Sequence, residues 1–227
     1  MDQNISRKIY IYWKFHPVTS TLLLINFMLV LVLIFNGGFS SINLVAFGAI
    51  YPPFVLEDNQ WYRLVTAMFL HGNIIHFLMN SLFLFYLGSH LERLIGQLRY
   101  GFLYAVAGII SSIFVVYFGP YNAITIGSSG SLFGIVGALL LLTFLKRSWF
   151  APQEIKSIRQ LVIINLILTF AIREISTPGH LGGLLTGLTL FYFLIPEEPD
   201  LPNKIKKFQK ELQEKHHNIN ENDDDFI

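Results

Sequence analysis

Three short segments of the chain carry side chains of the types that cleave carbonyl compounds. Ser129 lies in the glycine-rich stretch Gly127–Gly134, and His180 opens a second glycine-rich stretch. His76 precedes Asn80 by four residues, so the two would share one face of a helix. A serine becomes a nucleophile when a histidine takes its proton, and histidine and asparagine can donate hydrogen bonds to an oxyanion. Together these residues supply the parts of a serine hydrolase.

Each of these residues also has a purely structural interpretation. A single serine in a membrane helix commonly bonds its own backbone, and a single histidine or asparagine commonly bonds a neighbouring helix. The pairs Gly130–Gly134 and Gly183–Gly187, each one turn apart, are typical of helices that pack closely in lipid. If these two strips contact each other, they bring Ser129 within hydrogen-bond reach of His180. The structural interpretation of the glycines therefore supports the catalytic interpretation of the polar residues.

The composition places the chain in a membrane. Hydrophobic residues make up 53% of the 227 residues and charged residues only 14%, whereas soluble domains carry about 25% charged residues. The net charge of +1 gives no indication of nucleic acid, and the absence of cysteine excludes disulfides and thiolate chemistry. No H-E-x-x-H pattern is present, which excludes a zinc site of that type. We expect no metal and no other cofactor.

Apolar runs of spanning or nearly spanning length predict about six transmembrane helices, since roughly 20 helical residues cross a bilayer. The runs cover residues 19–35, 74–91, 100–118, 129–145, 161–172 and 180–195. The mixed segment 37–73 is expected to be a long loop associated with the membrane surface. We therefore predict an all-α membrane bundle over residues 19–195, between an N-terminal segment (1–18) and a polar, flexible tail (196–227).

Basic residues predict how the bundle lies in the membrane. Lys and Arg precede the first run, separate the second from the third and the fourth from the fifth, and follow the sixth. Only Arg63 and Arg173 fall on the other side. The positive-inside rule then places both termini in the cytoplasm. Ser129 and His180 begin their helices on the opposite side, so the site is expected to open away from the cytoplasm.

The acidic residues exclude a different mechanism of membrane proteolysis. No aspartate lies in any of the six runs, which excludes a pair of catalytic aspartates. This also leaves no acidic third member for a triad, so Ser129 and His180 are expected to act as a dyad. The alternative from another class is a small transporter, in which the polar residues line a path. The matching interrupted helices of repeat-based transporters are not evident in the sequence.

Taken in chain order, the motifs resemble those of the rhomboid intramembrane serine proteases over about residues 43–194. Gly127-Ser128-Ser129-Gly130 resembles the family's G-x-S-G, whose serine is the nucleophile. His180-x-x-Gly183-x-x-x-Gly187 resembles the motif of the final helix, whose histidine is the base. His76-x-x-x-Asn80 resembles the H-x-x-x-N of the second helix, whose side chains help the backbone N–H of the nucleophile to bind the oxyanion.

Further residues extend or modify this resemblance. Tyr62-Arg63 is similar to the W-R motif of the first loop, with Tyr in place of Trp, and Glu92-Arg93 falls where the family has such a pair. Phe133 stands where many relatives have a tyrosine packed on the catalytic histidine, and its ring can still stack. The resemblance implies a bundle of the basic six-helix form that cleaves membrane proteins in or near their transmembrane segments. A catalytically inactive relative that binds membrane proteins is the alternative within the family.

Overall fold

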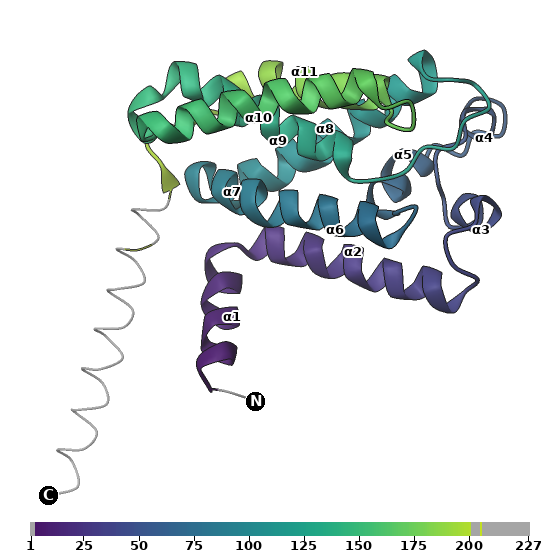
Figure 1. The fold of residues 1–227 in the computed structure, drawn as a ribbon, viewed down its shortest axis with the longest axis horizontal. Helices are drawn as coiled ribbons and strands as arrows, with labels where there is room; N and C mark the ends of the chain where they lie inside the picture. The colour runs from purple at the N-terminus through teal and green to yellow at the C-terminus, as the bar shows by residue number, and fades with distance from the viewer. Residues whose placement is uncertain (1–2, 201–204, 206–227) are drawn as a thin grey trace, which may run out of the picture.

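The structure is a computed structural model that describes residues 3–200 and residue 205 of the chain. Within that part, six helical segments lie side by side and no strand is formed (Figure 1). They are α2 (Pro17–Phe35), α6 (Ile74–Phe83) continued by a π-helical turn (Leu84–Gly88) and α7 (Ser89–Ile95), α8 (Gln97–Phe118), α9 (Ser129–Leu145), α10 (Pro152–Ala171) and α11 (Thr177–Thr189). The predicted all-α bundle is confirmed. Most of the tail predicted over residues 196–227 lies outside the described residues.

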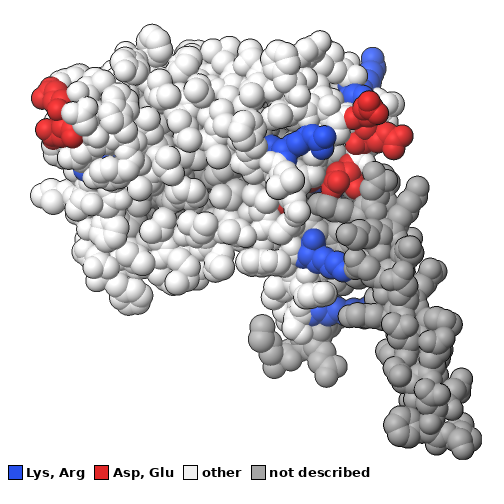
Figure 2. Space-filling model, turned by 180° about the vertical axis from the view of Figure 1, so that it is seen from behind, with Lys and Arg blue, Asp and Glu red and all other residues white. Residues whose placement is uncertain are grey.

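The lengths and the surface of these helices identify a protein that crosses the membrane several times. α2, the continuous segment Ile74–Ile95 and α8 are each long and apolar enough to span a bilayer, and α9 is a shorter apolar helix. On the face drawn in Figure 2, charged side chains gather towards the two ends, and a wide surface between them carries none. The bundle therefore presents an apolar band to lipid.

The fifth and sixth helices begin earlier than the apolar runs predicted. α10 begins at Pro152 rather than near residue 161, because charged residues lower the hydropathy of its first turns without breaking the helix. Glu154 caps this end through a hydrogen bond of 2.7 Å from a backbone N–H group. α11 begins at Thr177 instead of residue 180. Basic residues expected in the loop before the fifth span thus lie on α10 itself.

An additional helix, α1 (Gln3–Phe15), occupies most of the N-terminal segment and lies across the direction of α2 (Figure 1). His16 separates the two helices with non-helical backbone angles, as residues before proline tend to do. α2 then begins at Pro17, where a proline fits the first helical turn. The buried carboxylate of Glu92 accepts hydrogen bonds from the backbone N–H groups of Val18 and Thr19 at 3.0 and 2.9 Å. Glu92 on α7 thereby caps the start of α2.

The long first loop folds into a cap at one end of the bundle (Figure 1). Its helical pieces are α3 (Ser41–Ala46), α4 (Pro52–Leu56), α5 (Arg63–Thr66) and a 3₁₀ turn (Ala67–Phe69). The buried guanidinium of Arg63 donates hydrogen bonds to the carbonyl oxygens of Val45 and Ala49 at 2.7 and 2.8 Å. Arg63 thus satisfies backbone groups that the irregular chain would otherwise bury unpaired.

At the centre of the bundle, α9 packs on both α8 and α11. A side-chain carbon on Gly183 would overlap the carbonyl oxygen of Gly130, and one on Gly187 would overlap that of Gly134. A carbon on Gly134 would instead collide with Ala107 of α8. The predicted contact between the two glycine strips is therefore confirmed, and the strip on α9 also packs closely against α8.

Gly183→Ala is expected to destabilise the bundle by forcing α9 and α11 apart. Overpacked cores typically lose about 1–3 kcal/mol, so the unfolding temperature of the purified protein in detergent should fall. Gly101→Ala on α8 is the matched control, since its added carbon would make only ordinary contacts, 3.6 Å from Val18. Equal unfolding temperatures for the two variants would show that the close contact contributes nothing to stability.

Candidate functional site

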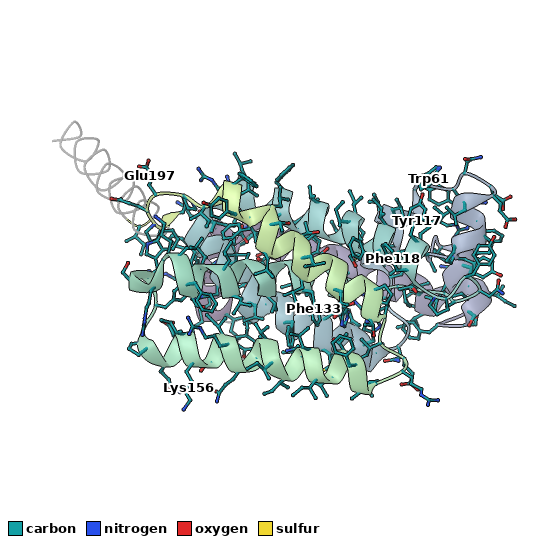
Figure 3. All side chains as sticks on the ribbon, turned by 90° about the horizontal axis from the view of Figure 1, so that it is seen from above. Trp61, Tyr117, Phe118, Phe133, Lys156 and Glu197 are labelled. Carbon is teal, nitrogen blue, oxygen red and sulfur yellow. The ribbon has the colours of Figure 1, made fainter. Side chains whose placement is uncertain are left out.

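A cavity of about 780 Å³ lies between α6, α9, α10 and α11. Its walls include Ser129, His180, His76 and Asn80, together with Phe133. Figure 3 shows Phe133 between α10 and α11. The structure thus brings around one space the four residues that the sequence singled out for chemistry.

Ser129 is the first residue of α9, and the local backbone explains its exposure to the cavity. Gly127 has a φ of 115°, a left-handed conformation that glycine adopts without penalty, and its N–H donates to the carbonyl oxygen of Ala67 at 2.9 Å. The first N–H groups of a helix have no partner within that helix, so the N–H of Ser129 makes no bond within α9. Ser128, by contrast, is fully buried and does not line the cavity.

His180 is held by a stacked ring and by a hydrogen bond. Its ring centroid lies 3.9 Å from that of Phe133, at an interplanar angle of 21°, so the predicted stacking is confirmed. Nδ1 of His180 lies 2.8 Å from Oγ1 of Thr169 on α10. Only 8% of His180 is exposed. The ring is therefore fixed from one face and from one edge.

The hydrogen bond expected between Ser129 and His180 is not formed. Both residues line the same cavity, but within the described residues the hydroxyl of Ser129 makes no hydrogen bond. The glycine strips bring the two helices together, whereas the direction of the imidazole is set by Phe133 and Thr169. In free enzymes such hydrogen bonds are often long and tighten only when substrate binds.

His76 and Asn80 reach the start of α9 from the facing helix α6. Asn73 caps α6 by accepting a hydrogen bond from the N–H of His76 at 2.8 Å. A side-chain carbon on Gly127 would lie 2.8 Å from Nε2 of His76 and 3.6 Å from Nδ2 of Asn80. Both side chains therefore lie against the turn that carries Ser129. Nδ2 of Asn80 is buried without a hydrogen-bond partner in the described part of the chain.

The cavity also contains residues that the sequence analysis did not single out. Asn165 and Thr169 of α10 line it; two polar residues four apart in an apolar run are the signal that could have found them. Arg63 and Glu92, expected to support the site, lie outside the cavity and hold the first loop and α2. Among the described residues, no cluster of three or more His, Cys, Asp or Glu could hold a metal ion.

Fold and site together define a polytopic membrane protein whose helical bundle contains a largely apolar cavity lined by a few polar side chains. A family model described as the Rhomboid domain matches residues 58–197, which is more than half of the chain. The chain belongs to the rhomboid family.

Curated relatives show how far the similarity extends. The chain is 39% identical to Rhomboid protease GluP of Bacillus subtilis (strain 168) over 153 residues, which are 67% of this chain and 30% of GluP. It is 34% identical to RHOMBOID-like protein 2 of Arabidopsis thaliana over 163 residues, or 70% of this chain and 50% of that protein. It is 30% identical to Rhomboid-like protease 3 of Toxoplasma gondii over 168 residues, which are 70% of this chain and 61% of that protein. The aligned part thus spans less than two thirds of each of these relatives.

Gly127→Ala is expected to disturb the site more than backbone strain alone would. Its methyl group would lie 2.8 Å from the ring of His76, in addition to the strain of alanine in a left-handed conformation. Gly37→Ala is the matched control, because Gly37 has a φ of 105° but open space around it. In Gly127→Ala, the rate at which a fluorophosphonate labels Ser129 should fall by about 10², which is the effect of a 1 Å displacement in an active site. In Gly37→Ala, the labelling rate should stay native. Equal labelling rates would contradict this placement of His76.

Proposed function

We propose that the chain is an intramembrane serine endopeptidase whose catalytic unit comprises residues 19–195. One observation carries the proposal: Ser129 and His180, on two helices in backbone contact, line a single cavity beside an unpaired amide donor. Two of the similar proteins described above are named as proteases, which supports the same activity.

The residues of the cavity can carry out the complete hydrolysis of a peptide bond. His180 takes the proton of Ser129 as the serine oxygen attacks the peptide carbonyl, and later gives it to the leaving amine. The oxyanion is bound by the N–H of Ser129 with His76 and Asn80. A water molecule then attacks the acyl-enzyme with His180 again as base, which regenerates the free serine. No metal or other cofactor is required for these steps.

The lining of the cavity favours substrates that come from the membrane. α6 contributes Met79 and Phe83, α10 contributes Leu168, and Ile172 follows directly after α10. A transmembrane segment that unwinds locally must have its freed backbone groups hydrogen-bonded, which is tolerated only inside protein or beside water. An apolar cavity with a few polar side chains provides both conditions. We therefore take the substrates to be membrane proteins cleaved in or near their transmembrane segments.

We place both termini in the cytoplasm and the cavity on the opposite side of the membrane. Lys146 and Arg147 follow the end of α9 that is remote from Ser129, and Lys156 lies in the first turns of α10. Thr169, near the other end of α10, lines the cavity. The cluster of basic residues is therefore at the end of the bundle away from the site, and the positive-inside rule makes that end cytoplasmic.

Ser129→Ala and His180→Ala are each expected to abolish cleavage of a single-span reporter protein in lipid vesicles. Removing the nucleophile or the base costs on the order of 10⁶ in kcat in a serine protease. Ser128→Ala is the matched control, because Ser128 is buried away from the cavity and should be dispensable for chemistry. A folded Ser129→Ala variant that cleaves at the native rate would contradict the proposal. If the native chain binds reporters but cleaves none, the alternative of a catalytically inactive family member that binds membrane proteins would be favoured.

His76→Ala and Asn80→Ala should each slow the chemical step without abolishing it. Loss of one oxyanion donor typically costs about 10²–10³ in rate, and the backbone N–H of Ser129 remains. Met79→Ala, on the same helix and in the same cavity, controls for the loss of side-chain volume. Single-turnover cleavage rates provide the measurement. Native rates for both donor variants would assign these side chains to packing alone.

A further inference from the structure

A threonine hydroxyl makes two hydrogen bonds inside the site. Oγ1 of Thr169 lies 2.7 Å from the carbonyl oxygen of Asn165, one turn earlier on α10, and 2.8 Å from Nδ1 of His180 on α11. Thr169 is 1% exposed, so little water can compete for either bond. The arrangement is also fixed between the helices, because the hydroxyl of Thr177 on α11 donates to the carbonyl oxygen of Thr169 at 3.1 Å.

The proton count decides which way these hydrogen bonds run. A hydroxyl has one proton, and a carbonyl oxygen can only accept. When both contacts are hydrogen bonds at the same time, the proton of Thr169 goes to the carbonyl oxygen of Asn165, and a lone pair of Oγ1 accepts from His180. Nδ1 of His180 must then carry a hydrogen. In a neutral imidazole, a hydrogen on one nitrogen leaves the other nitrogen unprotonated, and that nitrogen is Nε2.

We propose that Thr169 is a positioning residue that holds His180 in the tautomer whose Nε2 is free to act as the base. The proposal rests on the proposed function, since it concerns how His180 takes the proton of Ser129. After that transfer both ring nitrogens carry hydrogens, and Oγ1 of Thr169 still accepts from Nδ1. The same bond therefore serves the neutral base and its protonated form. Thr169 occupies the place that a buried aspartate fills in Ser-His-Asp triads, but adds no charge inside the membrane.

Thr169→Val removes this acceptor while keeping the shape of the side chain. With no partner at Nδ1, the proton distributes over both nitrogens of His180, because the tautomer is set by the hydrogen bond that the other nitrogen makes. Magnetic resonance of the full chain in lipid, with isotope-labelled histidine, should show a Nδ1–H tautomer in the native protein and a mixture in Thr169→Val. The signals of His180 are identified by their loss in His180→Ala.

The kinetic consequence should appear in kcat and not in KM. For Thr169→Val we expect about a tenfold fall in kcat on the single-span reporter, which corresponds to about 1.4 kcal/mol. Thr169→Ser, which keeps the hydroxyl, should restore both the tautomer and kcat. Thr186→Val is the matched control, since Thr186 is buried and donates to the carbonyl four residues earlier at 2.8 Å. Among the described residues, no hydrogen bond joins Thr186 to His180, so the Thr186→Val protein should have a native kcat.

Several outcomes separate this inference from the proposed function. An Nε2–H tautomer of His180 in the native chain would overturn the inference without any variant, even if Thr169→Val failed to fold. So would a Thr169→Val protein with native tautomer and native kcat, while His180→Ala remained inactive. Full cleavage by Ser129→Ala would instead overturn the proposed function. The tautomer measurement would then describe only the hydrogen bond between Thr169 and His180, without a role in catalysis.

Discussion

The backbone contact between α9 and α11 is the constraint on which the site depends. Lipid gives little hydrophobic drive for helices to associate, so close approach and dispersion must hold them. The glycines allow this approach, because a side chain on Gly183 or Gly187 would overlap a carbonyl oxygen of α9. Ser129 is adjacent to Gly130, and His180 precedes Gly183 by less than one turn. The residues that hold the bundle together therefore also determine the distance between Ser129 and His180.

The cost of burying charge distinguishes the residues at the ends of the bundle from those in the buried part of the cavity. Buried charges are tolerated when they are paired or well hydrogen-bonded. Arg63 donates to loop carbonyls, and Glu92 accepts from the first turn of α2, so each replaces missing backbone partners at an end of the bundle. The buried part of the cavity instead contains neutral polar groups such as Asn80 and Thr169. A neutral site keeps its hydrogen-bonding capacity without the desolvation cost of a fixed charge.

The convergence of four polar residues on one cavity could be predicted because polar groups are rare in apolar runs and the glycine pairs show where helices touch. The start of α10 could not, because hydropathy measures compatibility with lipid, and a helix can continue into polar turns. Thr169 was missed for another reason. A threonine in a membrane helix commonly bonds the carbonyl one turn earlier, and Thr169 does so as well. Its second bond, to His180, joins two helices and leaves no local trace in the sequence.

The unpaired amide of Asn80 is compatible with the donor role that we propose for this residue. A buried donor without a partner costs about 1–3 kcal/mol in the free protein. Nδ2 of Asn80 lacks one among the described residues, yet Asn80 lines the cavity beside the turn that carries Ser129. Donors fixed in advance need no reorganisation when negative charge develops, which is why they stabilise a transition state more than water does. Under the proposed function, the stability lost by leaving this amide unpaired in the free protein would be recovered when a tetrahedral intermediate places its oxyanion there.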